Sequence, residues 1–166
     1  MRSKIGLRYE QIYINTFCVQ SHHHKTFPLG ASIGEWGDCN PPDWQNFTKN
    51  GVSDTALRWT NNRLTFKISG SFSSTQQSMI RTATANIQRN TGGCITLNEV
   101  SSAPGGNYVD VINSGSGCWS YVGMLGRGKQ ELHLADGCFR MGTIEHEFLH
   151  ALGVHHEHIR PDRCVT

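Results

Sequence analysis

The sequence predicts an α+β domain, and three observations support this class. Residues 64–69 (LTFKIS) alternate apolar and polar side chains, as a strand with one buried face does. Residues 73–93 carry apolar side chains at helical spacing, and short strand-like segments follow before a second helical stretch begins near residue 143. Because a strand, a helix, several strands and another helix follow in this order, we expect a sheet backed by helices.

The first helix has recognisable ends and one apolar face. Residues 73–75 (SST) are candidate N-caps, since their hydroxyl groups can accept hydrogen bonds from the first free backbone N–H groups. Gly92 and Gly93 follow the helical pattern as a stop signal. The side chains expected to pack on the sheet are Ile80, Ala83, Thr84 and Ile87.

Four further strand-like segments contain β-branched or aromatic residues and are separated by glycine-rich turns. They cover residues 94–100, 108–113, 118–123 and 130–134. We therefore expect the folded domain over residues 55–166, after a poorly patterned, leader or propeptide-like segment over residues 1–54. Within that segment, the three histidines at 22–24 are interpreted as solvated chain rather than as a metal site.

Composition and charge exclude several classes of function. The 166 residues carry 15 basic and 13 acidic side chains, and they contain no basic block of the kind that nucleic acid binding requires. No window approaches the roughly 18 consecutive apolar residues of a membrane span. We therefore expect no nucleic acid partner and no membrane span. The first 17 residues are interrupted by charges and do not resemble a signal peptide.

The six cysteines favour an oxidising compartment. They lack the paired CxxC spacing of a structural zinc site, so disulfides are the better interpretation. Asn46-Phe47-Thr48 is an acceptor triplet for N-glycosylation, which matters only in a secreted protein. These features favour secretion, whereas no signal peptide is visible. A missing or misassigned N-terminus would explain this conflict. The cysteines are Cys18, Cys39, Cys94, Cys118, Cys138 and Cys164.

The stretch TIEHEFLHALGVHHEHIRPDRC, residues 143–164, concentrates the residues that can carry chemistry. At helical spacing, His146 and His150 lie one turn apart, which suits two ligands of a tetrahedral zinc ion. Glu147 lies beside them, where it can take a proton from a zinc-bound water and return it to a leaving amine. The opposite side of this helix is an apolar stripe of Ile144, Phe148 and Ala151.

A third ligand is expected from the residues after this helix. Gly153 can adopt the left-handed backbone that ends a helix, and it can turn the chain back toward the metal. His156, three residues later, is then the third donor, and the complete pattern HExxHxxGxxH indicates zinc more specifically than HExxH does. The alternative is a surface helix that carries several histidines by chance. His155 and His158 are interpreted as solvated or hydrogen-bonded bystanders.

HEFLHALGVHHEHIRPDR resembles the extended signature HExxHxxGxxHExxRxDR of the astacin family of zinc metalloendopeptidases, in the metzincin clan, and it meets every fixed position. The start of the family's mature domain is similar to ALRWTNNRLTFKIS in this sequence. The segment before the family's zinc helix is similar to SGCWSYVGMLGRGKQELHLADGCFRMGTIEHE. The resemblance covers about residues 50–163, the N-terminal subdomain of such enzymes. It implies a twisted, mostly parallel sheet with one antiparallel edge strand, a backing helix and a zinc-binding active-site helix.

The same resemblance implies a function. It indicates a secreted endopeptidase that hydrolyses protein or peptide substrates with one zinc ion per chain. His146, His150 and His156 correspond to the family's zinc ligands, and Glu147 corresponds to its general base, which activates the zinc-bound water.

Activation by cleavage is a further implication of the resemblance. Glu157 matches the position that holds the freed N-terminus of the mature enzyme, although it can also be an ordinary exposed carboxylate paired with Arg160 or Arg163. Cleavage after Lys49 would free Asn50, at about the place where mature chains of this family begin. Asp38, in EWGDC, is a candidate for the aspartate that blocks zinc in the precursor, but Glu35 stands where the family has an aromatic residue.

Two other features follow from the resemblance. Cys118 and Cys138 match the family's local disulfide, whereas the partner that Cys94 has in the family is absent unless Cys164 replaces it. Residues Trp119, Ser120 and Tyr121 are expected in the edge strand that lines the substrate cleft. The alternative for the two aromatic residues is a place in the core or the cleft wall.

The family pattern breaks after the zinc motif. Astacin-like enzymes continue into a second subdomain with a methionine-containing turn and a tyrosine near the metal, and residues 1–166 do not contain it. Cys164 also stands where the family usually has an aspartate. Two hypotheses remain at this point: an incomplete chain of a zinc endopeptidase, or a truncated, inactive relative that binds zinc or a peptide without turnover.

Overall fold

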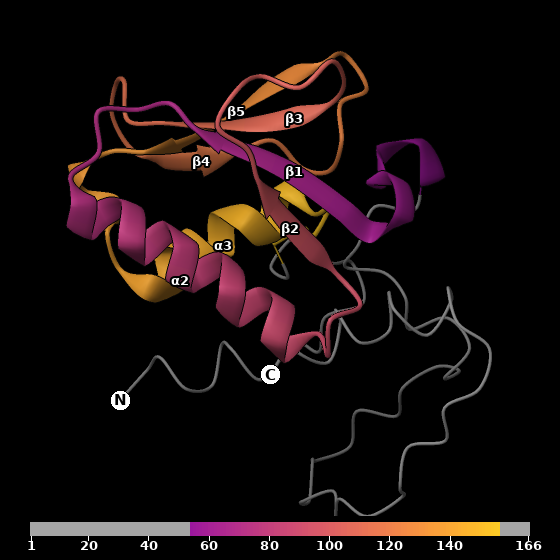
Figure 1. Cartoon of the computed structure of the whole chain (residues 1–166), viewed down its shortest axis with the longest axis horizontal. Coiled ribbons are helices and arrows are strands. Elements are labelled where there is room, and N and C mark those ends of the chain that lie inside the picture. The colour runs from indigo at the N-terminus through magenta and orange to yellow at the C-terminus, as the bar shows by residue number, and fades with distance from the viewer. Residues whose placement is uncertain (1–53, 157–166) are drawn as a thin grey trace, which may run out of the picture.

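The computed structural model describes residues 54–156, and a five-stranded sheet lies at their centre (Figure 1). The strand order is β2-β1-β3-β5-β4, and all neighbouring pairs are parallel except β4 with β5. The predicted mostly parallel sheet with one antiparallel edge strand is therefore confirmed. The strands are β1 (Arg63–Ile68), β2 (Thr96–Glu99), β3 (Tyr108–Ile112), β4 (Cys118–Ser120) and β5 (Lys129–Leu134).

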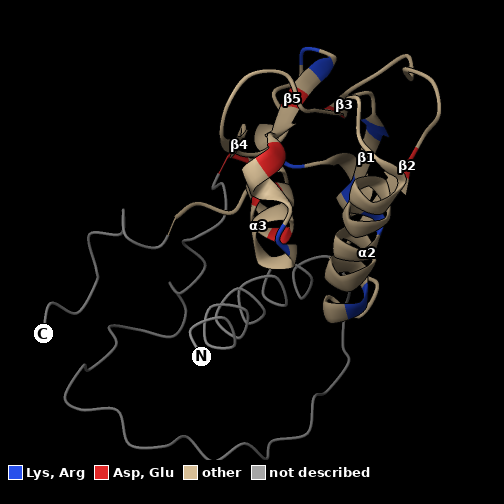
Figure 2. Ribbon diagram, turned by 90° about the vertical axis from the view of Figure 1, so that its left-hand side faces the viewer, with Lys and Arg blue, Asp and Glu red and all other residues tan. Residues whose placement is uncertain are grey.

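Two α-helices, α2 (Ser74–Asn90) and α3 (Met141–Ala151), cover one face of this sheet (Figure 1). α2 carries basic and α3 acidic residues (Figure 2), and the two helices are joined by Asn86, whose amide donates to Glu145 Oε1 at 2.9 Å. Neither helix has the length and apolar character that crossing a membrane requires. Short 3-10 turns are η2 (Thr55–Leu57), η3 (Thr60–Asn62) and η4 (Asp136–Cys138).

Helix α2 begins and ends where the sequence predicts. The Ser73 hydroxyl accepts a hydrogen bond from the Gln76 N–H at 3.2 Å, and Gln76 Oε1 accepts from the Ser73 N–H at 2.8 Å. This reciprocal capping box satisfies two N–H groups that the first turn would otherwise leave unpaired. Gly92 and Gly93, with φ of 61° and 77°, end the helix. The predicted apolar face is confirmed, because its buried residues are Ile80, Ala83, Thr84 and Ile87.

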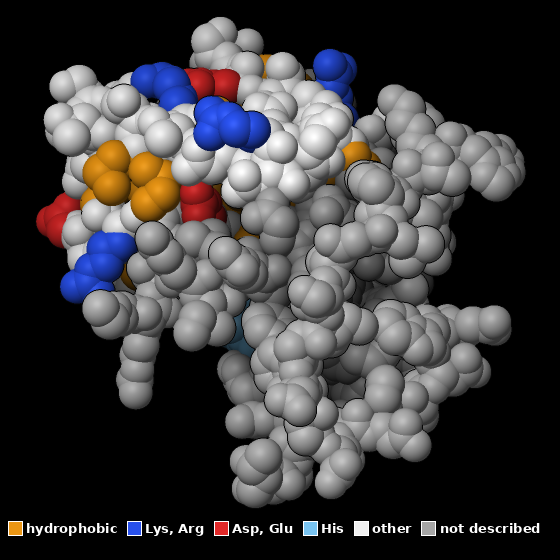
Figure 3. Space-filling model, turned by 90° about the horizontal axis from the view of Figure 1, so that it is seen from below, with side chains coloured by type: hydrophobic (Ala, Val, Ile, Leu, Met, Phe, Trp, Pro, Cys, Tyr) orange, Lys and Arg blue, Asp and Glu red, His pale blue; other side chains and the backbone are white. Residues whose placement is uncertain are grey.

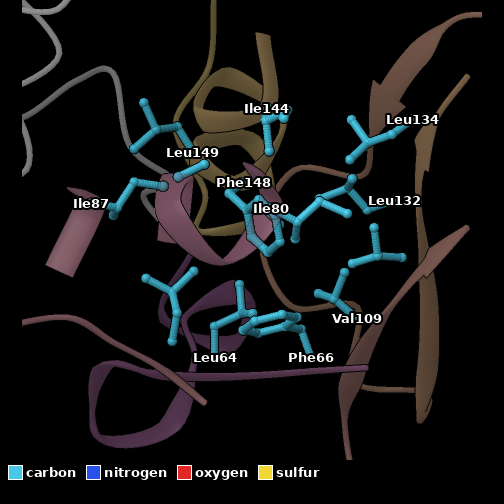
Figure 4. Close-up of a cluster of buried hydrophobic side chains, with 14 of the residues drawn as sticks. Leu64, Phe66, Ile80, Ile87, Val109, Leu132, Leu134, Ile144, Phe148 and Leu149 are labelled. Carbon is cyan, nitrogen blue, oxygen red and sulfur yellow. The ribbon is translucent and has the colours of Figure 1, made fainter. Parts of the chain in front are cut away.

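The core lies between the sheet and the two helices (Figure 4). The predicted stripe of α3 is fully buried, since Ile144, Phe148 and Ala151 are each 0% exposed. The Phe148 ring meets Phe66 of β1 edge to face, with centroids 5.3 Å apart. Burying a side chain of this size contributes roughly 1.5–3 kcal/mol of folding free energy. The apolar stripe therefore fixes which side of α3 faces away from the sheet.

The two edges of the sheet differ in how they are protected. At the β2 edge, the Leu97 N–H donates to Gln88 Oε1 of α2 at 3.0 Å, and Arg81 pairs with Glu99 at 2.8 Å. Gln88 thereby occupies a backbone N–H that an incoming strand would need, and the Arg81–Glu99 pair places charged side chains at the same edge. Along β4, by contrast, no strand of residues 54–156 pairs with the outer edge. The open edge of the described sheet is β4.

The strand predicted over residues 118–123 is shorter than expected, because β4 ends at Ser120. Tyr121 lies outside the strand, and the backbone beyond it finds partners elsewhere. The Gly123 N–H donates to the His150 carbonyl at 2.9 Å, and the Met124 N–H donates to the Leu57 carbonyl at 2.7 Å. The chain therefore leaves the β4–β5 ladder to contact α3 and the segment before β1.

A disulfide between Cys118 and Cys138 ties β4 to the turn before α3, as the resemblance implies. Cys94 is also disulfide-bonded. Replacing Cys118 and Cys138 together by serine is expected to lower the free energy of unfolding by about 3 kcal/mol, because the bond closes a loop of 20 residues in the unfolded chain.

Denaturant titration without reductant measures this loss, because the bond of Cys94 then stays intact in both proteins. A loss below about 1 kcal/mol would show that the disulfide constrains the unfolded chain much less than the chain-entropy model requires.

Several predicted features lie outside the described residues. They are the boundary of the leader segment, the cleavage site at Lys49 and Asn50, and the roles of Asp38, Glu157, His158 and Cys164.

Candidate metal centre and active site

Three histidine side chains converge at the C-terminal end of α3. The Nε2 atoms of His146 and His150 lie 2.9 Å apart, and His156 Nε2 lies 3.0 Å from the first and 2.8 Å from the second. The ligand atoms of these three histidines are close enough to hold one ion, and within residues 54–156 no other group of three His, Cys, Asp or Glu side chains meets this condition. Seen from the helix side, histidine reaches the molecular surface (Figure 3).

The backbone after α3 brings the third histidine back to the helix. Gly153 has φ of 105°, and its N–H donates to the His150 carbonyl at 2.8 Å. The Val154 N–H donates to the Leu149 carbonyl at 2.9 Å. These two bonds form a Schellman motif, which ends a helix and reverses the chain, and its left-handed position favours glycine. The turn predicted at Gly153 is therefore present, and it places His156 beside the two helical histidines.

A backbone carbonyl sets the tautomer of His150. Its Nδ1 lies 2.6 Å from the Val154 carbonyl oxygen, which can only accept a hydrogen bond. Nδ1 therefore carries the hydrogen, and the Nε2 lone pair points toward the other two histidines. Neutral imidazoles held in this way are typical metal ligands. The sequence did not predict this contact, because the carbonyl of any residue type can make it.

The three nitrogens fit a zinc ion in number and type. A tetrahedral zinc ion with Zn–N bonds of about 2.0–2.1 Å separates its ligand nitrogens by roughly 3.3 Å. The observed separations of 2.8–3.0 Å are within about half an ångström of that value. Imidazole nitrogens also suit zinc better than calcium or magnesium, which prefer oxygen ligands.

Glu147 lies next to this cluster and is buried, with 4% of its surface exposed. Its Oε2 atom has no hydrogen-bond partner, which is uncommon for a buried carboxylate. Burial raises the pKa of Glu147 above its ordinary value, and the charge of His146 acts in the opposite direction. A carboxylate with raised proton affinity and an unused oxygen is suited to accept a proton.

Contacts from distant segments hold the C-terminal end of α3 in place. The Trp59 indole N–H donates to the Ala151 carbonyl at 2.7 Å within the buried core. The Gly123 N–H binds the His150 carbonyl from the other side. Both bonds satisfy carbonyls that a helix end leaves unpaired. Trp59 is thus a positioning residue that the sequence did not reveal, because its partner lies 92 residues away.

The loop between β4 and β5 connects the sheet edge to this centre. Gln130 is buried; its amide donates to the Gly123 carbonyl at 2.9 Å, and its Oε1 accepts from the Leu125 N–H at 3.0 Å. Gly123 has φ of 76°, and a Cβ there would lie 2.7 Å from the Leu57 carbonyl oxygen. The loop therefore requires a glycine where it packs between α3 and the segment before β1.

The predicted edge residues lie on both faces of β4 and beyond its end. Trp119 and Ser120 belong to β4, and Tyr121 follows it. Trp119 is 37% and Tyr121 39% exposed, so neither is a core residue, and the alternative core placement is wrong. Their rings meet edge to face with centroids 5.6 Å apart. His155 is exposed and lies outside the cluster of three histidines, in keeping with a bystander.

The chain belongs to the astacin family of peptidases, because the family model described as Astacin matches residues 51–165. It is 42% identical over 110 residues to Blastula protease 10 of Paracentrotus lividus, covering 64% of this chain and 18% of that protein. It is also 38% identical over 115 residues to Zinc metalloproteinase nas-13 of Caenorhabditis elegans, covering 69% of this chain and 24% of that protein. The chain thus spans about a quarter or less of these curated relatives.

A solved structure supports the same fold. The chain is similar to High choriolytic enzyme 1, a hatching enzyme zinc-protease from Oryzias latipes, with a TM-score of 0.54 and 28% sequence identity. The match covers 65% of this chain and 55% of that one. The predicted family and fold class are therefore confirmed.

Proposed function

We propose that this chain carries the metal-binding site of a zinc-dependent endopeptidase, in which His146, His150 and His156 hold one zinc ion and Glu147 is the general base. One observation carries the proposal: the Nε2 atoms of two histidines on α3 and of His156 after its end converge within 3.0 Å of one another, beside a buried carboxylate oxygen of α3 that has no partner. Bound zinc supplies Lewis acidity, which polarises a peptide carbonyl and acidifies water.

The role of Glu147 follows from its surroundings. Its carboxylate takes a proton from the water that attacks the peptide carbonyl carbon, and it then delivers that proton to the nitrogen of the leaving amine. The C–N bond breaks, and a carboxylic acid and an amine are released. Burial raises the pKa of Glu147, so the group holds the proton between the two steps more readily than an exposed glutamate does.

The open edge of the sheet supports protein or peptide substrates. An extended peptide can add to β4, because that edge offers backbone N–H and C=O groups, whereas α2 side chains occupy the β2 edge. The loop after β4 contacts the His150 carbonyl through Gly123, so a peptide along β4 passes close to the metal centre. The disulfides at Cys118, Cys138 and Cys94 support an extracellular location.

The full chain, refolded with its disulfides and supplied with Zn²⁺, tests this proposal. We expect about one zinc per chain by atomic absorption and hydrolysis of an unfolded protein substrate, because three histidines form one site. A strong zinc chelator should abolish the hydrolysis, and added Zn²⁺ should restore it. A folded chain that binds one zinc ion and cleaves no peptide would contradict the endopeptidase proposal and favour a zinc-binding relative without turnover.

A further inference from the structure

Helices α2 and α3 cover one face of the sheet and leave the other uncovered (Figure 1). A stacked pair of rings lies on that outer face. Trp119 of β4 and His133 of β5 are directly opposite in the strand register. Their rings lie almost parallel, with 3.9 Å between centroids and 17° between planes. The neighbouring side chains Leu132 and Leu134 point into the core, so the alternation along β5 directs His133 outward. The imidazole thus supports the indole of the open edge strand.

Both nitrogens of His133 face oxygen atoms. Nδ1 lies 2.9 Å from the Ser114 carbonyl oxygen, and Nε2 lies 3.2 Å from Glu131 Oε2. A carbonyl and an ionised carboxylate can only accept hydrogen bonds, so the ring satisfies both only when each nitrogen carries a hydrogen. The hydrogen bond from His133, followed by that from Lys129, holds the pKa of Glu131 below its ordinary value. In its charged form the ring therefore lies between a carboxylate and an indole with both nitrogens paired.

We propose that His133 is a positioning residue for the peptide-binding edge: its charged ring holds Trp119 and β4 in place, and the edge binds peptides more weakly once the ring loses its proton. This inference rests on the proposed peptidase function of the β4 edge. A cation stacked on an indole is attracted by the negative face of the ring, and a hydrogen bond to a charged group adds to this attraction. An edge that is already ordered loses less conformational entropy when a peptide pairs with it.

Loss of the proton changes these contacts in a definite way. A neutral ring that still donates to Ser114 presents its Nε2 lone pair to Glu131, and that contact is repulsive. Glu131 then keeps Lys129, whose Nζ lies 3.2 Å from Oε1. Fewer bonds then hold His133 under Trp119.

The charged groups around His133 come from three elements. On its own strand they are Glu131 and Lys129, and on β3 Asp110 lies 3.8 Å from Lys129 Nζ. After β4, the Arg127 guanidinium lies 5.6 Å from the Tyr121 ring centroid. Among these groups only Glu131 hydrogen-bonds the imidazole. It is therefore the partner whose removal tests the proposal.

The test measures peptide affinity without zinc, so that release of the metal at low pH does not contribute. The zinc-free histidines of the metal centre still change charge over the range in which histidine titrates, so each pH effect is compared with that of His133→Phe. The probe is a fluorescently labelled peptide, Lys-(Val-Thr)4-Lys, whose binding to the chelator-treated full chain is followed by fluorescence anisotropy. We expect binding to be roughly threefold to tenfold tighter at pH 5.5 than at pH 8.0. Equal affinity at both pH values would overturn the positioning role while leaving the peptide edge intact.

Three variants assign the pH effect to His133. His133→Phe keeps a flat ring under Trp119 but cannot be charged, so it should lose the part of the pH effect on peptide affinity that His133 contributes. Glu131→Gln should also reduce the dependence of peptide affinity on pH. An amide can accept a hydrogen bond from the charged ring or donate one to the neutral ring. Lys129→Gln removes a charge from the same strand and is the matched control, which should keep the wild-type profile. A pH effect in His133→Phe as large as that of the wild type would contradict the proposal.

Trp119 emission gives a readout that needs no peptide. The signal of Trp119, taken as the difference between wild type and Trp119→Phe, should change between pH 5.5 and pH 8.0, and the change should vanish in the His133→Phe background. If this emission changes as expected but no peptide binds at either pH, the peptide edge of the proposed function fails while the ring contact stands. If it does not change, the contact itself is refuted.

Discussion

Glu147→Gln is expected to lower the rate of peptide hydrolysis by about two to four orders of magnitude, the usual contribution of a general base. Glutamine has nearly the shape of glutamate but cannot take up a proton from water at neutral pH. The carboxylate that it replaces is buried and leaves one oxygen without a partner, so the group is available for chemistry rather than committed to a structural bond. The three histidines are unchanged, and zinc binding should persist.

Cleavage of a quenched fluorescent peptide, with zinc content measured on the same samples, checks this result. Glu145→Gln is the matched control, since Glu145 lies on the same helix and is equally buried but accepts a hydrogen bond from Asn86. We expect it to change the rate by less than about threefold, because it is not part of the proton transfer. Similar losses in the two variants would indicate damage to α3, and full activity of Glu147→Gln would refute the assigned base.

The second large effect is expected for zinc affinity. Replacing His150 with alanine should weaken zinc binding by more than roughly 100-fold, because loss of a supporting contact alone costs 10-fold to 100-fold and this change removes a ligand. The His150 Nε2 atom forms one corner of a triangle, 2.9 Å from His146 Nε2 and 2.8 Å from His156 Nε2. Its removal therefore leaves two nitrogens that cannot complete a tetrahedral site.

Competition with a chromogenic chelator measures the affinity of each variant for Zn²⁺. His155→Ala is the control, because His155 stands beside His156 in the sequence, is exposed and lies outside the cluster. Its affinity should match the wild type within about twofold. An equal loss in both variants would show that zinc binds through the histidine-rich segment in general, and an unchanged His150→Ala would remove this residue from the site.

Much of the fold could be predicted because it depends on neighbours in the sequence. The capping box at Ser73, the buried face of α2 and the apolar stripe of α3 follow from helical spacing, which acts over a few residues. The HExxH pattern and Gly153 likewise determine where the metal-binding nitrogens can lie, since one helical turn and one Schellman motif relate them. The disulfide and the mostly parallel sheet with one antiparallel edge strand came from the family resemblance rather than from such local patterns.

Other features depend on contacts between distant segments. The early end of β4 results from bonds that Gly123 and Met124 make with α3 and with the segment before β1. The supporting contact of Trp59 spans 92 residues, and the stack of Trp119 on His133 requires the β4–β5 register. No periodicity in the sequence encodes such pairings, because each becomes possible only when the sheet has assembled.

The sequence by itself therefore determined the histidine motif, the glutamate proposed as its base and the helix that carries them, because all three are set within one short stretch. The tertiary structure alone decided how the opposite, β2 edge of the sheet is covered and how deeply Glu147 is buried. It also decided which carbonyl orients His150. Burial and edge protection are properties of packed elements, and they arise only when residues far apart in the chain occupy the same space.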